Sequence, residues 1–125
     1  MLKFPYLSLD ILNKYKKDLL WSQYYIKDLR KIIGSDLNKT LINASRNGRL
    51  DHVIISITLG ANIHFQDNWA VIRASKNGHI DVVRYLVNEG ANIHAQDDYA
   101  VRWASQNGHL DIVIYLVNNG ANIHA

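Results

Sequence analysis

The chain of 125 residues is long enough for one domain, and its 48% of hydrophobic residues is ordinary for a folded protein. It contains no cysteine, which excludes a disulfide framework and thiol chemistry. The formal net charge is +3, and the excess lies in residues 1–34, which hold seven Lys or Arg against three Asp. A nucleic-acid surface needs a denser basic stripe with stacking aromatic residues or a reading element, so we predict a solvated helical face instead.

The first segment, residues 1–36, is predicted to form an N-terminal helical cap or a degenerate repeat. Its apolar residues follow helical spacing from Leu7 to Ile33 and stop at Gly34-Ser35, with Ser8 as the expected N-cap. The pattern fits either one bent helix or two. We find no cleavable signal sequence, and no apolar run reaches the roughly 20 residues that span a bilayer. We therefore expect a soluble, cytoplasmic protein without a secretion signal.

From residue 37 onward the sequence repeats itself with a period of 30 residues. Residues 67–95 and 97–125 are identical at 20 of 29 aligned positions, and a weaker copy reads NKTLINASRNGRLDHVIISITLG. Because fixed periods of 20–50 residues indicate stacked supersecondary units, we predict three units, at residues 37–66, 67–96 and 97–125. Two series of glycines share the period and are interpreted as structural turns that stop helices: Gly48, Gly78 and Gly108, and Gly60, Gly90 and Gly120.

Each unit contains two predicted short helices. In the third copy, Ala100 and Ala104 lie on one face of the first helix, which ends at Gly108 because glycine tolerates the left-handed conformation of a C-cap. The second helix, LDIVIYLVNN, has Asp111 in its first turn and a broad apolar face, and Gly120 ends it. A helix pair of this size cannot bury its apolar face alone, so the units must stack into an α-solenoid.

The first unit departs from the other two inside its second helix. Ser56 replaces Leu86 and Leu116, and His52 replaces Val82. A hydroxyl or imidazole buried without a partner costs about 1–3 kcal/mol. We therefore expect this degenerate unit to be looser, or its second helix to be turned towards water.

The run NGHLDIVIYLVNNGANIHA resembles the second helix and exit loop of ankyrin repeats, and the resemblance covers about residues 38–125. It implies an all-α, ankyrin-type α-solenoid of helix–turn–helix repeats joined by β-hairpin fingers. The family period is about 33 residues. The three residues missing here fall between Asp97 and Tyr99, so the hairpin loops should be short. The 30-residue period is similar to that of the expanded ankyrin families of giant amoebal viruses.

Six histidines raise the question of a metal site. Equivalent residues in stacked units lie about 8–10 Å apart, whereas a histidine nitrogen binds zinc at about 2 Å. No unit supplies a second ligand at suitable spacing, so we predict no metal site. His79 and His109 should fill the turn after each glycine, as in the ankyrin pattern, and the other recurring series should bond backbone in the hairpin connection: His64, His94 and His124.

Catalytic signals are absent from the sequence. No nucleophile–base pair, phosphate-binding glycine loop or cofactor motif is evident. We therefore predict no catalytic residues, no cofactor and no enzymatic activity.

The units differ from one another on one face of the first helix. Residues 103, 106 and 107 share this face, opposite Ala100 and Ala104, because they are three and four positions apart. In ankyrin stacks this face lines the concave groove, so its variation indicates either a binding surface or drift on a solvated face. The predicted protein-binding residues, with Trp103 as aromatic anchor, are Arg46, Asn68, Trp69, Arg73, Lys76, Asp98, Tyr99, Trp103 and Gln106.

The functional prediction is a non-catalytic protein–protein interaction module that binds its partner through the concave groove. Basic residues on the first helices, including Arg102, and acidic residues on the second favour an acidic protein partner, with neither nucleic acid nor a membrane involved. Two alternatives stay open. In the first, the protein is an adaptor whose residues 1–34 recruit a second machine such as a ubiquitin ligase, and Phe4-Pro5 followed by a helix would then be a truncated F-box-like segment. In the second, the chain is a remnant of an expanded repeat family without a selected partner. The last unit keeps an interior sequence without a C-terminal cap, so we expect a monomer with an exposed apolar end.

Overall fold

Six helices, numbered α3 to α8, make up the described part of the chain. The computed structural model describes residues 36–123, and the helices are α3 (Leu37–Asn47), α4 (Leu50–Thr58), α5 (Phe65–Lys76), α6 (Ile80–Asn88), α7 (Ala95–Gln106) and α8 (Leu110–Asn118). No strand occurs between residues 36 and 123. The predicted cap lies outside the described residues, apart from Asp36 at its end, and so does His124.

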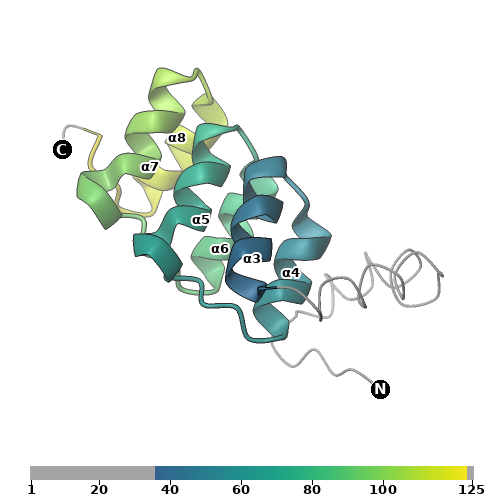
Figure 1. Ribbon diagram of the computed structural model, residues 1–125. Coiled ribbons are helices and arrows are strands. Elements are labelled where there is room, and N and C mark those ends of the chain that lie inside the picture. The colour runs from purple at the N-terminus through teal and green to yellow at the C-terminus, as the bar shows by residue number, and fades with distance from the viewer. Residues whose placement is uncertain (1–35, 124–125) are drawn as a thin grey trace.

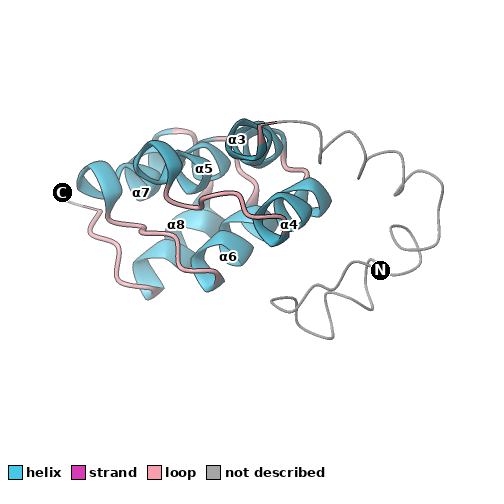
Figure 2. Ribbon diagram, turned by 60° about the horizontal axis from the view of Figure 1, so that its bottom comes forward, coloured by secondary structure: helices cyan, strands magenta, loops and turns pink. Residues whose placement is uncertain are grey.

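The helices form two layers. Helices α3, α5 and α7 lie side by side in one layer, and α4, α6 and α8 lie in the other (Figures 1 and 2). Neighbouring helices of the first layer pack closely, whereas those of the second layer barely touch one another. The stack therefore bends towards the first layer, and we call the exposed surface of α3, α5 and α7 the concave face. The predicted all-α solenoid is confirmed.

Small side chains allow the first layer to pack closely. Ala74 and Ala104 are completely buried, and so are Ser45 and Ser75, each of which directly follows a buried alanine in its helix. The larger core side chains fill the space between the layers, where burying each one removes apolar surface from water and stabilises the stack by about 1.5–3 kcal/mol. The largest fully buried ones are Leu41, Ile55, Ile72, Leu86, Ile112 and Leu116.

The connection that leads into α5 and α7 differs from the β-hairpin expected from the ankyrin resemblance. Gln66, Asp67 and Asn68 have φ values of 52°, 54° and 64°, and residues 96–98 repeat this conformation with φ values of 55–58°. Left-handed backbone costs an ordinary L-residue roughly 1–2 kcal/mol, and Asn and Asp tolerate it best. Three successive left-handed residues turn the chain directly into the helix, so the shorter period is accommodated without a finger.

Side chains stabilise these left-handed turns. In the third repeat Arg102 donates from Nε to the carbonyl oxygen of Asp97 at 3.0 Å and from its guanidinium NH2 group to that of Gln96 at 3.1 Å. In the second repeat the equivalent residue is Ile72, which is buried in the core. Arg102 therefore belongs to the framework of the turn, although the sequence suggested a role on the basic surface.

The first described repeat does not contain the unsatisfied buried hydroxyl that its sequence led us to expect. Ser56 is fully buried, and its hydroxyl donates to the carbonyl oxygen of His52 at 2.7 Å within the same helix. This bond satisfies the hydroxyl and removes the predicted penalty. Helix α4 is not turned towards water either, because Ile54 is buried where the equivalent residues Arg84 and Ile114 are exposed.

Histidine side chains tie each repeat to the preceding one. His79 Nε2 donates to the carbonyl oxygen of Arg46 at 2.9 Å, and His109 Nε2 donates to that of Lys76 at 2.9 Å. The carbonyl oxygen can only accept, so Nε2 carries the hydrogen in both rings. The approach is close enough to require glycine: a Cβ at Gly48 would lie 2.5 Å from His79 Nδ1.

The second histidine series links the loop at the end of one repeat to the first helix of the next through side chains. His64 Nδ1 lies 2.8 Å from Asn68 Oδ1, and His94 Nδ1 lies 2.7 Å from Asp98 Oδ1. We expected these rings to bond backbone, but their partners are the side-chain oxygens at the start of the following helix. The same oxygen of Asp98 also accepts a hydrogen bond from the backbone N–H of Asn122, at the end of the third repeat, at 3.0 Å.

Candidate functional site

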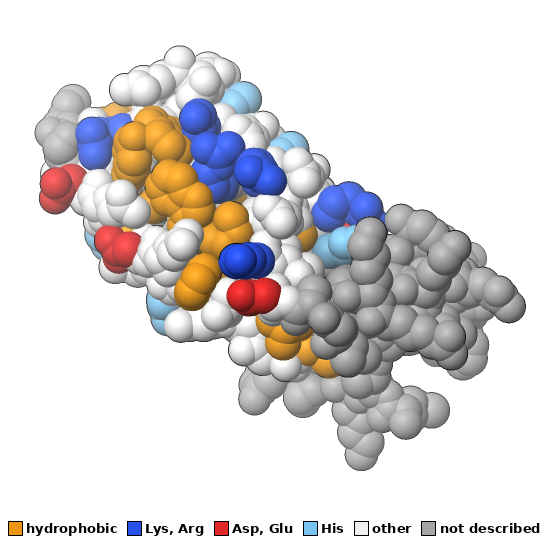
Figure 3. All heavy atoms as spheres, in the orientation of Figure 1, with side chains coloured by type: hydrophobic (Ala, Val, Ile, Leu, Met, Phe, Trp, Pro, Cys, Tyr) orange, Lys and Arg blue, Asp and Glu red, His pale blue; other side chains and the backbone are white. Residues whose placement is uncertain are grey.

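The concave face carries three bands of side chains. Figure 3 shows hydrophobic side chains running diagonally across α7, α5 and α3, a cluster of Lys and Arg along one edge, and Asp or Glu along the other. The basic edge follows the last turns of α3 and α5, which carry Arg46, Arg73 and Lys76. The acidic edge follows the first turns, because Asp67 and Asp97 lie at the starts of α5 and α7.

Aromatic side chains from two neighbouring repeats meet in the middle of this face. The ring centroids of Trp69 on α5 and Trp103 on α7 are 5.6 Å apart in an edge-to-face arrangement, and those of Tyr99 and Trp103 are 4.0 Å apart. All three rings are half-buried. Such pairs add about 0.5–1.5 kcal/mol beyond the area that they bury. The cluster therefore helps to hold α5 against α7 while it keeps aromatic surface accessible.

Cationic groups lie against the same rings. Lys76 Nζ is 4.3 Å from the centroid of the Trp103 ring, and the Arg73 guanidinium carbon is 5.9 Å from that of Trp69. A cation–π contact at an exposed site contributes about 0.5–1 kcal/mol. Both charges are thus held beside the aromatic cluster instead of extending freely into water, which places positive charge and apolar surface together.

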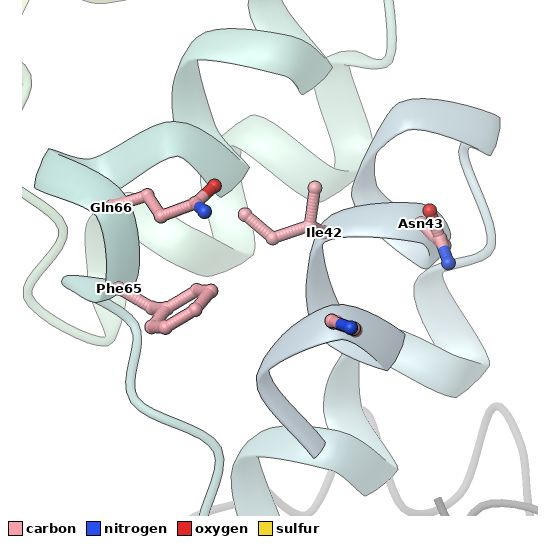
Figure 4. A pocket seen from close by; sticks show the side chains of 5 residues that line it. Ile42, Asn43, Phe65 and Gln66 are labelled. Atoms are coloured by element: carbon pink, nitrogen blue, oxygen red, sulfur yellow. The ribbon is translucent and has the colours of Figure 1, made fainter. Parts of the chain in front are cut away.

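A shallow pocket lies at the other end of the hydrophobic band. Its volume is about 160 Å³, and its lining comes from α3 and from the turn that leads into α5. Figure 4 shows the Phe65 ring and the Ile42 side chain pointing towards one another across it, with Gln66 above and Asn43 farther along α3. The lining residues are Lys39, Ile42, Asn43, Phe65 and Gln66.

The structure brings most of the predicted surface residues together. Trp69, Arg73, Lys76, Tyr99 and Trp103 form one contiguous set through the ring and cation contacts given above. Arg46 and Gln106 are exposed in the last turns of α3 and α7.

Two predicted surface residues have framework roles instead. Asn68 and Asp98 are only 4% and 7% exposed. Asn68 Oδ1 is occupied by the His64 ring and by the N–H of Asn92 at 2.9 Å, and Asp98 is held in the same manner. We therefore leave both residues out of the candidate surface.

The pocket was not predicted from the sequence, although one signal for it was present. Phe65 stands where Ala95 stands in the next repeat, so the otherwise repeated phrase GANIHA reads GANIHF once. A large aromatic residue replacing alanine in a connecting turn indicates local surface specialisation. Ile42, which faces it, aligns with Ile72 and Arg102 and gave no separate signal.

Shifted pKa values occur on the side of the second helices. Burial pushes the pKa of Asp51 upward, but hydrogen bonds from Arg49 at 3.0 and 3.2 Å and from the N–H of His52 outweigh it, so the pKa is lowered. Burial, with the nearby charge of Glu89, raises the pKa of Tyr85, and burial raises the pKa of Glu89 itself. These shifts belong to packing around α4 and α6 and not to the concave face.

None of the helices in residues 36–123 is both long enough and apolar enough to span a membrane. The same range contains no group of three or more His, Cys, Asp or Glu side chains arranged to hold a metal ion.

Comparison with known proteins agrees with this architecture. None of the curated proteins searched matches the chain. A family model described as Ankyrin repeats (3 copies) matches residues 41–125, which is more than half of the chain and includes most of α3 and every described helix that follows. Ankyrin repeats generally mediate protein–protein interactions. The chain therefore belongs to the ankyrin repeat family.

Proposed function

We propose that this protein is a non-catalytic interaction module that binds a protein partner through its concave face. The observation that carries the proposal is the cluster of Trp69, Tyr99 and Trp103, half-buried and flanked by Arg73 and Lys76 on an otherwise exposed face. Trp, Tyr and Arg are the residues most enriched where binding energy concentrates in protein interfaces.

Differences between the repeats support the same conclusion. The glycine turns and histidine hydrogen bonds are repeated, whereas position 103 is Trp in α7 and its equivalents are Arg73 and Asn43. Substitutions that spare the framework and change one exposed face are those expected of a binding surface. The groove residues that we assign are Arg46, Trp69, Arg73, Lys76, Tyr99, Trp103 and Gln106.

The repeat period also supports an origin and a place of action. The 30-residue period, with its GANIHA loops, is similar to that of giant amoebal virus ankyrin families, so we propose that the module works in the cytoplasm of a host cell. Expression in such a cell followed by imaging of the tagged protein tests the location.

Affinity purification of the full chain from its native cell tests the binding proposal. We expect a specific partner to be lost from the Trp103→Ala variant, because the substitution removes the centre of the aromatic cluster. The matched control is Ile114→Arg, which changes an exposed residue of the other helix layer to the residue found at the equivalent position 84. Circular dichroism establishes that both variants are folded. A partner that binds the Trp103→Ala variant normally and is lost from Ile114→Arg would contradict the assignment to the concave face.

A further inference from the structure

The charges of the concave face are sorted across it, with positive charge along one edge and negative charge along the other. No carboxylate between residues 36 and 123 forms an ion pair with Arg46, Arg73 or Lys76. Arg46 is exposed, and its guanidinium donates to the Asn43 side-chain oxygen at 2.8 Å, which leaves its charge uncompensated. The basic edge thus presents three positive charges beside an apolar band.

The opposite edge is already compensated in part. Asp36 accepts hydrogen bonds from the backbone N–H groups of Asn38 and Lys39 and so caps α3. Exposed Lys39 lies in the first turn of the same helix, and Arg102 lies beside Asp97 because it bonds that residue's carbonyl oxygen. Because these nearby cations offset part of its negative charge, the acidic edge should attract an oppositely charged ligand less strongly than the basic edge.

The spacing of the helices indicates which backbone form fits the hydrophobic band. Packed helices lie about 8–10 Å apart, so apolar sites on α3, α5 and α7 recur at about that interval. In a partner α-helix, residues i and i+7 lie on one face about 10.5 Å apart, given a rise of 1.5 Å per residue. A strand places same-face residues about 7 Å or about 13 Å apart. The helix repeat lies closer to this interval than either strand repeat does.

We propose that the occupant of the concave face is an amphipathic helix with acidic side chains along one flank of its apolar face. The helix lies across α3, α5 and α7, with its acidic flank against Arg46, Arg73 and Lys76. One apolar side chain enters the pocket between Ile42 and Phe65, and another rests on the cluster of Trp69 and Trp103. This inference rests on the proposed function, and it adds the partner's charge, backbone form and orientation.

Single-stranded nucleic acid would use the same kinds of side chain, but it fits the geometry less well. Bases stack on open aromatic ring faces. A base that stacked on the face of the Trp103 ring beside Lys76, whose Nζ lies 4.3 Å from the ring centroid, would have to displace that cation, and Tyr99 approaches the same ring at 4.0 Å. The cations lie beside the apolar band, so a partner that carries carboxylates next to aliphatic side chains would contact both.

A displayed library of helical peptides tests the proposal without knowledge of the natural partner. The peptides contain about 20 residues on an alanine-rich scaffold, a length at which an isolated helix forms, and their surface positions are randomised. Selection uses the full chain, with the Trp103→Ala variant as counter-selection. We expect the enriched peptides to carry apolar residues at i and i+7 with Asp or Glu on one flank only. Enrichment of basic, uncharged or helix-breaking sequences would overturn the proposal.

Charge reversal then tests the orientation with the selected peptides. The variant with Arg73→Glu and Lys76→Glu should bind the acidic peptides roughly tenfold or more weakly, and it should gain affinity for versions in which Lys replaces each acidic residue. Arg84→Glu, an exposed reversal on α6, is the matched control and should leave affinity unchanged. Fluorescence anisotropy at several salt concentrations measures both. Equal binding by the double variant and the wild type would show that the basic edge is not used.

The outcomes separate this inference from the proposed function. Binding of a fluorescent single-stranded oligonucleotide is measured to the same variants. If its binding depends on Arg73 and Lys76 as peptide binding does, the occupant of the concave face is nucleic acid and the helix proposal is refuted. A cellular protein partner that depends on Trp103, found when the library yields no acidic helix, would leave the interaction module standing and refute the acidic helix. If neither peptides nor a Trp103-dependent cellular partner are found, both proposals fail.

Discussion

His109 and Gly78 fit together across the boundary between two repeats. The imidazole of His109 lies so close to Gly78 that an added Cβ would be 2.7 Å from its Cε1 atom, while its Nε2 bonds the carbonyl oxygen of Lys76. Gly108 has the same positive φ but nothing within 4 Å of the equivalent point. The two glycines therefore separate the cost of close approach from the cost of backbone conformation.

We predict that Gly78→Ala destabilises the protein more than Gly108→Ala. The Gly108 variant should lose about 1–2 kcal/mol because alanine is strained at positive φ. The Gly78 variant should lose a further 0.5–1.5 kcal/mol or so, because the methyl group displaces His109 and breaks its hydrogen bond. Urea unfolding monitored by tryptophan fluorescence measures the difference, provided that the m-value is unchanged. Equal losses would mean that the histidine ring moves aside without cost.

Asp98 offers a test of the buried hydrogen bonds that close each repeat. Asp98→Asn should be tolerated within about 1 kcal/mol, because Asn68 performs the same role one repeat earlier. Asp98→Ala should cost about 1–3 kcal/mol, since it leaves the N–H of Asn122 and the His94 ring without their acceptor. The same unfolding measurement checks both variants. A tolerated alanine would show that water replaces the carboxylate.

The exposed face of α8 should make it the least protected helix of the second layer. Leu110, Ile114 and Val117 are 68%, 51% and 42% exposed and share one face. The equivalent residues Ile80 and Val87 of α6 are only half-exposed or less. Hydrogen exchange in dilute solution should therefore be faster for amides of residues 110–119 than for those of 80–89. Equal protection would show that this face is covered in solution.

The lowered pKa of Asp51 predicts a contribution to acid stability. Because its folded-state pKa lies below the ordinary value, ionised Asp51 stabilises the fold at neutral pH, and this contribution is lost as pH falls through the folded-state pKa. Unfolding midpoints measured from about pH 6 to about pH 2 should fall more steeply for the wild type than for Asp51→Asn. Parallel curves would mean that the Arg49 contact adds no net stability.

Periodicity made the fold predictable, because stacked units repeat their core residues. The 30-residue glycine series and the alanine faces predicted helix pairs stacked into an all-α solenoid, and the described helices confirm that fold. The connection was predicted less well, since left-handed runs at residues 66–68 and 96–98 have no sequence rule comparable to a glycine stop. Asn and Asp in those runs are compatible with the conformation and do not require it.

The surface was harder to predict because burial depends on neighbours that a single repeat does not reveal. Asn68 and Asp98 vary between repeats as a ligand-contacting position would, yet both are buried acceptors with two hydrogen bonds each. Arg102 looked like a groove cation and instead bonds two carbonyl oxygens of its own turn. In each case the side chain has a structural role because it hydrogen-bonds a backbone group elsewhere in the chain, either 24 residues later or in the preceding turn.

The hydrogen bonds from the turns after the first helices all run in one direction. His79 and Asn77 donate to the carbonyl oxygen of Arg46, and His109 donates to that of Lys76, so each of these donors belongs to the later repeat. A stack built in this way has a head and a tail. A unit duplicated after α8 would find the carbonyl oxygen of Gln106 in the position that Lys76 occupies for His109, so lengthening at that side needs no new chemistry. At the other side of the stack, Arg49 stands where His79 and His109 stand in the later repeats. The consequence is that the array can be extended after α8 with the contacts that it already uses.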